Sequence, residues 1–241
     1  MAKVVGIIGG MGPLATVDLM RKIVLNTPVE RDQDHLHVIV DNYPQIPDRV
    51  AAILDGGPDP TPHLVASARR LVAAGAELLA IACNTAHHFL PALEEAVPIP
   101  FVHMPREVAW ALQGRGIREA WLLASTATVA IRLYQAPLAA AGIATVTPPD
   151  TLQQVVQEGI QAVKLGDLSR GEALFRRVID HAVQNGAQAV IAGCTEIPAV
   201  LTPEQVPVMI DPTELLARAI VREAFGGREA REGVIHDVHR V

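Results

Sequence analysis

The only two cysteines in the 241 residues occupy matching positions of an internal repeat. Sliding the sequence by 111 residues places Cys83 on Cys194, with residues 75–84 over residues 186–195 and no gap. An unperturbed thiol has a pKa of about 8.5, so near neutral pH it exists in both protonation states. Two thiols on opposite sides of a small substrate can remove a proton from one face of a carbon and deliver a proton to the other. The pair therefore predicts inversion at a carbon acid.

Each cysteine ends a short apolar segment that is typical of a buried strand. A small polar residue follows each cysteine. Open α/β sheets bind ligands just outside the carboxyl ends of their strands, so the two thiols are expected in a common cleft if the two halves face each other. A following helix N-terminus would favour the thiolate. One alternative is that each cysteine is buried as a small hydrophobe. The other is a disulfide between them, which is possible only if their Cα atoms lie within about 7 Å of each other. His87 and His88 offer no zinc-ligand spacing beside Cys83, so no metal is expected.

Short β-branched or Leu-rich segments alternate with longer segments of helical periodicity, which predicts parallel sheets covered by helices on both faces. The expected strands are residues 4–8, 37–40, 78–82, 101–103, 120–124, 144–146, 189–192 and 208–210. Helix starts are expected at Pro13, at Thr61–Pro62 and at Asp211–Glu214, the last as a capping box. Gly75 and Gly186 are expected to end helices.

Composition limits the class of protein. Apolar residues make up 50% and charged residues 19%, which supports a folded core of one large or two small domains. A formal charge of −6 and 3% aromatic residues oppose binding to nucleic acid. Neither a signal peptide nor an apolar segment of about 18 residues is apparent, so we expect no membrane span and a cytoplasmic protein with free thiols.

A glycine-rich loop, Gly6–Pro13, follows the first expected strand and precedes a helix. Its backbone can approach an anionic group at the helix N-terminus. The loop contains Gly10-Met11-Gly12 but lacks the full G-x-G-x-x-G spacing of dinucleotide-binding proteins. A carboxylate-binding loop fits these residues better than a nucleotide-binding one.

Several motifs together resemble the aspartate/glutamate racemase superfamily, and within it the cofactor-independent aspartate racemases. They span most of the chain in the family's order and are Gly6–Thr16, Asp32–His35, Pro44–Arg49, Ala82–His87 and Gly193–Pro198. The resemblance implies an α/β fold of two similar domains. Each domain has a short parallel sheet flanked by helices, and the active site lies in the interdomain cleft. We expect residues 1–105 and 208–241 in the first domain and residues 106–207 in the second.

The resemblance also implies an activity: interconversion of L- and D-aspartate without pyridoxal phosphate or another cofactor. Cys83 and Cys194 would be the acid/base pair. Further residues expected to contact the amino acid are Met11, Arg49, Asn84, Thr85, Ala86, Lys164 and Thr195. Aspartate brings two carboxylates, which an Arg and a Lys suit. The resemblance further suggests a homodimer.

The sequence departs from the family pattern near Ser125–Thr128, where Ala127 replaces a glycine, and at Ile131 or Arg132, where a serine is missing. These changes put aspartate specificity in doubt. Glu196 stands where glutamate racemases tend to carry His, and we expect it to be exposed, or else to tune the pKa of Cys194. His87 is expected to cap or pack unless it shares a helix face with Cys83.

Other functions stay open. Within the superfamily they are a glutamate or broad-specificity racemase and a hydantoin racemase; maleate isomerases and arylmalonate decarboxylases fit the motifs less well. Outside enzymes, a non-catalytic amino-acid-binding homologue or a thiol redox sensor would keep the cysteines for other reasons. The polar segment from Gly226 to Val241, with His236 and His239, is expected to pack loosely on the first domain or to be mobile.

Overall fold

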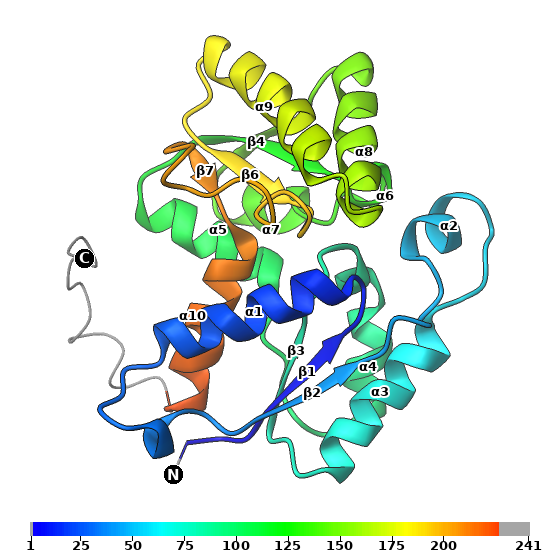
Figure 1. Cartoon of the computed structure of the whole chain (residues 1–241), viewed down its shortest axis with the longest axis vertical. Coiled ribbons are helices and arrows are strands. Elements are labelled where there is room, and N and C mark those ends of the chain that lie inside the picture. Colours follow the sequence, from blue (N-terminus) through cyan, green and yellow to red (C-terminus); the bar gives the residue numbers. More distant parts are fainter. Residues whose placement is uncertain (1, 227–241) are drawn as a thin grey trace.

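The computed structural model describes residues 2–226 and contains two parallel sheets with helices on both faces (Figure 1). This confirms the predicted α/β class with two similar domains. The first sheet has the order β2-β1-β3 and the second has the order β5-β4-β6-β7. The strands are β1 Val5–Gly9, β2 Val38–Asn42, β3 Leu78–Ile81, β4 Glu119–Ala124, β5 Ala144–Val146, β6 Val190–Gly193 and β7 Met209–Ile210.

Ten α-helices and two 3-10 turns connect these strands in the part of the chain that the structure describes. The helices of the first sheet are α1 Pro13–Asn26, α2 Arg49–Leu54, α3 Thr61–Ala73, α4 Leu90–Ala96 and α10 Pro212–Ala224, with turns η1 Asp32–Asp34 and η2 Thr85–Phe89. The remaining helices are α5 Met104–Gly114, α6 Thr126–Ala130, α7 Gln135–Ala140, α8 Asp150–Lys164 and α9 Leu168–Gln184.

The first three strands of each sheet share one topology, and the second sheet adds β7. In each, the first strand lies in the middle, and the second and third strands pair with it on opposite sides. The chain therefore runs from the first strand to the second on one side of it, and then crosses back to the third strand on the opposite side. This arrangement opens a crevice at the carboxyl edge between β1 and β3, and a second one between β4 and β6.

Alternating strand residues supply two cores per sheet. Ile7 packs with α1 and α10 on one face of β1, and Ile8 packs with α3 and α4 on the other. Leu123 of β4 packs with α8 and α9, while Leu122 packs with α5 and α7. The strands β1, β3 and β6 are buried on both faces and apolar throughout, as parallel strands usually are, whereas the edge strand β2 ends in the polar pair Asp41–Asn42.

The predicted glycine caps are confirmed at equivalent positions. Gly75 and Gly186 have φ angles of +99° and +79° and follow α3 and α9. In both cases the glycine N–H and the next N–H donate back to carbonyls of the last helical turn, the hydrogen-bond pattern of a Schellman motif. The repeat in the sequence thus corresponds to the same helix, cap and strand in each domain.

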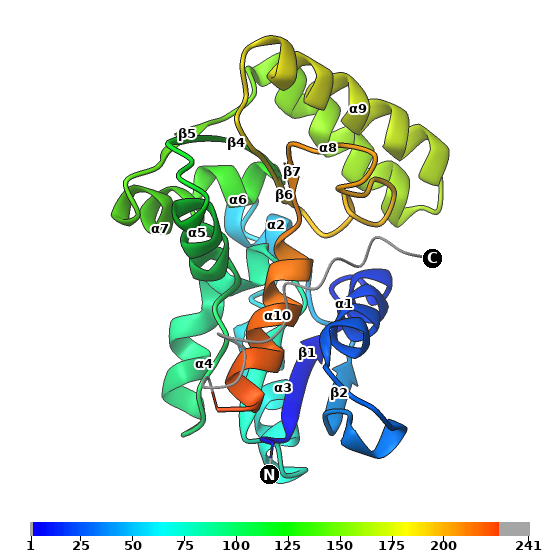
Figure 2. The same ribbon diagram turned by 90° about the vertical axis from the view of Figure 1, so that its left-hand side faces the viewer.

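Two helices cross between the domains. α5 carries Met104 in the first domain's core and Val108 and Leu112 in the second, and α10 runs from the second sheet back to the first (Figure 2). β7 pairs with β6, so residues 209 and 210 belong to the second sheet. This differs from the predicted boundary, which assigned all residues from 208 onward to the first domain, because one more strand precedes the return.

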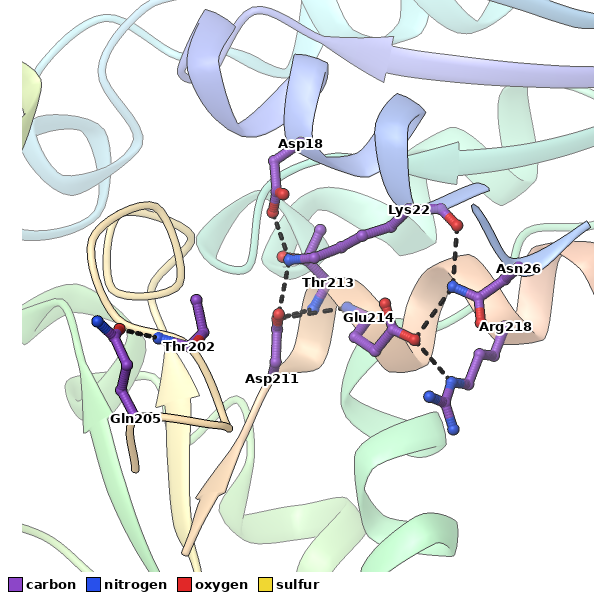
Figure 3. Close-up of polar contacts among 9 residues, drawn as sticks. All are labelled: Asp18, Lys22, Asn26, Thr202, Gln205, Asp211, Thr213, Glu214 and Arg218. Atoms are coloured by element: carbon purple, nitrogen blue, oxygen red, sulfur yellow. Dashed lines mark hydrogen bonds and ion pairs between the residues drawn. The ribbon is translucent and has the colours of Figure 1, made fainter. Parts of the chain in front are cut away.

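Lys22 joins α1 to the start of α10 (Figure 3). Its ammonium contacts Asp18 at 2.5 Å and Asp211 at 2.6 Å in a largely buried position. Burial lowers the pKa of Lys22, but the two carboxylates offset this and raise it overall. Asp211 also accepts from the backbone N–H groups of Thr213 and Glu214, as the predicted N-cap of α10. Removing the ammonium would leave the buried Asp211 carboxylate without a cationic partner, so this contact holds α1 against α10.

Most predicted elements agree with the structure, including the helix starts at Pro13 and at Thr61–Pro62. The predicted strand at residues 101–103 is wrong: only Phe101 forms a bridge, with Leu79. Pro100 precedes it and α5 begins at Met104, which leaves no room for a strand. His236 and His239 lie outside the described residues. Within residues 2–226, no helix is long and apolar enough to cross a membrane.

Candidate active site

Both cysteines line one cavity between the carboxyl edges of the two sheets. Cys83 follows β3 and Cys194 follows β6, at the crevices that the topology creates. The residues around the cavity are Met11, Asp48, Arg49, Val50, Cys83, Asn84, Thr85, Ser125, Gln157, Ile160, Lys164, Cys194, Thr195 and Glu196. All predicted site residues except Ala86 are among them. Ala86 is fully buried in the core beneath α3 and α4, because η2 turns its side chain inward.

The cavity is narrow, with a volume of about 20 Å³. A space of roughly 10–15 Å³ on this measure holds one water molecule. The two domains are therefore closed over the site, with α2 of the first packed against α6 of the second. Residues of both domains thus surround the cavity and narrow it.

Cys83 is buried in the apolar cluster beneath α3 and α4 and also lines the cavity. Its backbone carbonyl accepts a hydrogen bond from His87 Nδ1 at 2.8 Å, and His87 Nε2 accepts from the Met104 backbone N–H at 3.3 Å. Both ring nitrogens are thus hydrogen-bonded to the backbone, and the imidazole is a packing residue that does not contact the thiol. Burial, together with nearby His103, lowers the pKa of His87 to about 4. His87 is therefore a neutral structural residue that fixes the turn after Cys83.

Cys194 is partly buried and donates from Sγ to Glu196 Oε2 at 2.9 Å. The hydroxyl of Thr195 donates to the same oxygen at 3.3 Å. Burial, followed by the Glu196 carboxylate, raises the pKa of Cys194 well above its ordinary value, against an opposing effect of Lys164. The expected exposure of Glu196 is wrong, since its side chain is buried and bonded to the thiol. The sequence left this open because its pattern does not show which way a turn residue points.

The glycine-rich loop brings the start of α1 to Glu196. Gly10 has a φ of +90° and lies against the Tyr43 backbone, where a side chain would have no space. Thr16 accepts from the Gly10 N–H at 2.9 Å and ties the loop to α1. A Cβ placed on Gly12, the N-cap of α1, would lie 3.9 Å from Glu196 Oε1. The positive end of the helix thus faces the carboxylate.

Arg49 is buried and held by backbone carbonyls. Its Nη1 donates to Ile46 and Pro47 at 3.2 and 2.9 Å, and its Nη2 donates to Met11 at 3.2 Å. Among residues 2–226, its Nε finds no hydrogen-bond partner although the atom is fully buried. A buried donor without a partner is costly, so this N–H is suited to donate a hydrogen bond to an oxygen of a ligand.

Lys164 ends α8 and lines the cavity on one helix face with Gln157 and Ile160. Asp48 lies in the same cavity and caps α2 by accepting from the Ala51 N–H at 2.9 Å. Burial opposes ionisation of Asp48, but the Ala51 hydrogen bond and the charges of Lys164 and Arg49 lower its pKa overall. The cavity therefore holds two cationic and two anionic side chains, the anions being Asp48 and Glu196.

Hydroxyl groups join the domains beside Asn84. Thr85 Oγ1 lies 3.2 Å from Ser125 Oγ and 2.8 Å from Thr128 Oγ1, and Ser125 donates to Thr128 at 3.0 Å. Ala127, the departure from the family pattern, is fully buried and does not line the cavity. Its methyl group therefore changes the packing of α6 and not the cavity lining.

The sequence did not predict Asp48, Ser125 or Gln157 at the site. Ser125 directly follows β4 and could have been found by the same carboxyl-end rule as the cysteines. Gln157 shares the helical spacing of Lys164, and Asp48 precedes Arg49 within a motif already considered. Both cysteines are free thiols, and no cluster of metal-binding side chains occurs in the part of the chain that the structure describes.

The chain resembles proteins of known class. A sequence model of the family described as Asp/Glu/hydantoin racemase matches residues 8–220. The solved aspartate racemase of Picrophilus torridus is 32% identical with a TM-score of 0.86, covering 92% of this chain and 94% of that one. An aspartate racemase homologue from Pyrococcus horikoshii is 26% identical with a TM-score of 0.75, covering 93% and 100%. The broad-specificity amino-acid racemase RacX of Bacillus subtilis is 27% identical, covering 90% of this chain and 96% of its own.

Proposed function

This chain belongs to the Asp/Glu/hydantoin racemase family, and we propose that it interconverts L- and D-aspartate by proton transfer between Cys83, Cα and Cys194 without a cofactor. The observation that carries this proposal is that the only two thiols, from equivalent positions of two similar domains, line one closed cavity. The aspartate racemase of Picrophilus torridus, similar over nearly the whole chain, supports aspartate as the substrate.

In the proposed reaction, one thiolate takes the Cα proton from one face and the opposite thiol gives its proton to the other face. The Cα–H bond breaks, an S–H bond forms, and the resulting carbanion is protonated with inversion. Cys194 starts as the donor, because burial and Glu196 raise its pKa and keep it a thiol. Cys83 therefore starts as the base. In the reverse direction Cys194 must lose its proton, and Glu196 is placed to receive it.

The polar groups of the cavity complement an amino acid. The buried N–H groups of Arg49 Nε and Asn84 Nδ2 have no partner within the described residues and can donate to a carboxylate. Lys164 can neutralise a second carboxylate as a point charge. The carboxylates of Asp48 and Glu196 can accept from the ammonium group. We propose these roles for Arg49, Asn84 and Lys164. We also propose that Met11, Thr85 and Thr195 contact the amino acid.

The test is incubation with L-aspartate in deuterated water without added pyridoxal phosphate, following optical rotation and Cα-hydrogen loss. We expect racemisation with deuterium uptake, and loss of inversion in Cys83→Ser and in Cys194→Ser, because a serine hydroxyl is far too weak an acid to replace a thiol. Deuterium uptake separates the enzyme from a binding protein, which would incorporate none. Unchanged racemisation in either variant would overturn the two-cysteine mechanism.

Broad-specificity racemisation is the second candidate, favoured by one observation: Asp48 lies near Lys164 and offsets the charge that would select an acidic side chain. Lys164→Met distinguishes the two. An aspartate racemase should show a KM for aspartate raised about 10-fold, with Lys3→Met as the control, because a charge-assisted contact is removed. Equal turnover of alanine and aspartate in the wild type would favour broad specificity.

Two further proposals rest on the family resemblance. One is a cytoplasmic location, and the other is a homodimer. Size-exclusion chromatography with light scattering tests the second directly.

A further inference from the structure

Tyr134 reaches the candidate active site from the second domain although it does not line the cavity. It precedes α7, is fully buried among the residues that α5 and α7 cover, and donates from its hydroxyl to Asn84 Oδ1 in the first domain. Asn84 follows Cys83 directly and is itself 2% exposed. This contact places a hydroxyl of one domain on an amide beside the catalytic thiol of the other.

The contact determines which end of the amide serves the cavity. A side-chain amide has one oxygen acceptor and an NH₂ group with two donors, and either end can point either way. Burial raises the pKa of Tyr134 well above its ordinary value, so the hydroxyl keeps its proton and needs an acceptor. The Asn84 oxygen supplies that acceptor. Asn84 Nδ2 then has no partner among residues 2–226, although the atom is fully buried.

We propose that Tyr134 is a positioning residue that holds the Asn84 amide with its NH₂ group toward the cavity, so that Asn84 donates to a substrate carboxylate. This inference rests on the proposed function and adds a residue that determines the polarity of the site. With the amide reversed, its oxygen would face the carboxylate and repel it. The ammonium group of the substrate is then left to Asp48 and Glu196, the acceptors of the cavity.

The experiment measures steady-state kinetics with both aspartate enantiomers for Tyr134→Phe, Asn84→Ala and the double variant. Tyr134→Phe removes the hydroxyl and keeps the ring in its core. We expect KM to rise about 10-fold for both enantiomers with kcat changed less than about 3-fold, because the contact binds ground state and transition state alike. In the Asn84→Ala background, Tyr134→Phe should raise KM no further.

The control is Tyr43→Phe, which alters the only other tyrosine. Its hydroxyl contacts His63 at 3.1 Å in the first domain, away from the cavity lining, and kinetics should stay at wild-type values. An unchanged KM in Tyr134→Phe would overturn the inference. An equal rise in KM in the wild-type and Asn84→Ala backgrounds would also overturn it, because Tyr134 would then act as a structural residue, independently of the amide.

Asn84→Asp keeps the inference testable if Tyr134→Phe fails to fold. The aspartate retains an oxygen for Tyr134 but presents a second oxygen in place of the NH₂ group, so we expect KM to rise more than in Asn84→Ala. A KM below that of Asn84→Ala would contradict the proposed polarity. If the wild type racemises no amino acid, the proposed function fails by itself. The same variants are then compared by calorimetric affinity for L-aspartate, where an unchanged Kd in Tyr134→Phe would still overturn the inference.

Discussion

The two cysteines occupy equivalent positions of the repeat but have different neighbours. The residue two positions after the cysteine is Thr85 in the first domain and Glu196 in the second. Thr85 bonds to hydroxyls across the interface, whereas Glu196 accepts directly from the thiol of Cys194. Four positions after the cysteine, His87 in the first domain corresponds to Pro198 in the second. The backbone is repeated, and the chemistry around the sulfur is not.

The difference shows how a duplicated fold can give two similar groups unequal surroundings. The shared strand, cap and crevice put each thiol at the same edge of its sheet. The residues after the strand then differ, and burial together with Glu196 raises the pKa of Cys194. A reaction that needs one acid and one base on opposite faces starts from such an asymmetric pair.

Replacing Glu196 should have the largest effect on this asymmetry. Glu196→Gln removes the negative charge and the proton acceptor beside Cys194, so the pKa of Cys194 falls and its alkylation by iodoacetamide begins at lower pH. We expect kcat/KM to fall about 100-fold in both directions, because a positioned acid/base group contributes about that much. Glu158→Gln, an exposed residue on α8, is the matched control. An unshifted alkylation profile would show that the carboxylate does not control the thiol.

The first domain alone carries a buried histidine beside its cysteine, which predicts pH-dependent stability. The pKa of His87 is about 4 in the folded protein, below the ordinary value near 6.5. The unfolded chain therefore binds more protons between these values, and stability is present above pH 6.5 and lost as pH falls toward 4. Between pH 7 and pH 5 the loss from His87 is about 2 kcal/mol.

Urea unfolding of the wild type, His87→Gln and His88→Gln at the two pH values checks this prediction. His88 is exposed and adjacent, so its replacement should leave the slope unchanged. His87→Gln should reduce the slope, and the remaining slope includes a contribution from His103, whose pKa burial and the Arg106 charge also lower to about 4. Equal slopes in all three proteins would contradict the assignment of a neutral His87.

The helix caps should show the smallest effect and no difference between the domains. Gly75→Ala and Gly186→Ala each place a side chain at positive φ, and neither Cβ would meet an atom within 4 Å. Each substitution should therefore cost about 1 kcal/mol of unfolding free energy from backbone strain alone. Thermal unfolding of the two variants checks this, and costs that differ clearly would show that the repeat is less equivalent than its geometry indicates.

Most of the strands, the caps and the common cavity of the two cysteines could be predicted, because apolar segments, glycines after helices and polar residues at strand ends are visible in the sequence. The direction of a turn side chain leaves none, so Glu196 was expected at the surface. Tyr134 was also missed, since its ring is an ordinary core residue and only its hydroxyl crosses the interface. The strand at residues 208–210 was predicted, but its pairing with β6 was not, because the sequence pattern of a short strand does not show which sheet it joins.

The most direct test of whether the two thiols lie on opposite faces of the substrate removes one thiol and measures which aspartate enantiomer takes up deuterium. Cys83→Ser and Cys194→Ser are each incubated with both aspartate enantiomers in deuterated water, and Cα label is measured after chiral separation. The remaining cysteine can exchange the Cα proton only on its own face, so we predict that the two variants label opposite enantiomers without inversion. Labelling of the same enantiomer in both variants would contradict the opposed placement of Cys83 and Cys194.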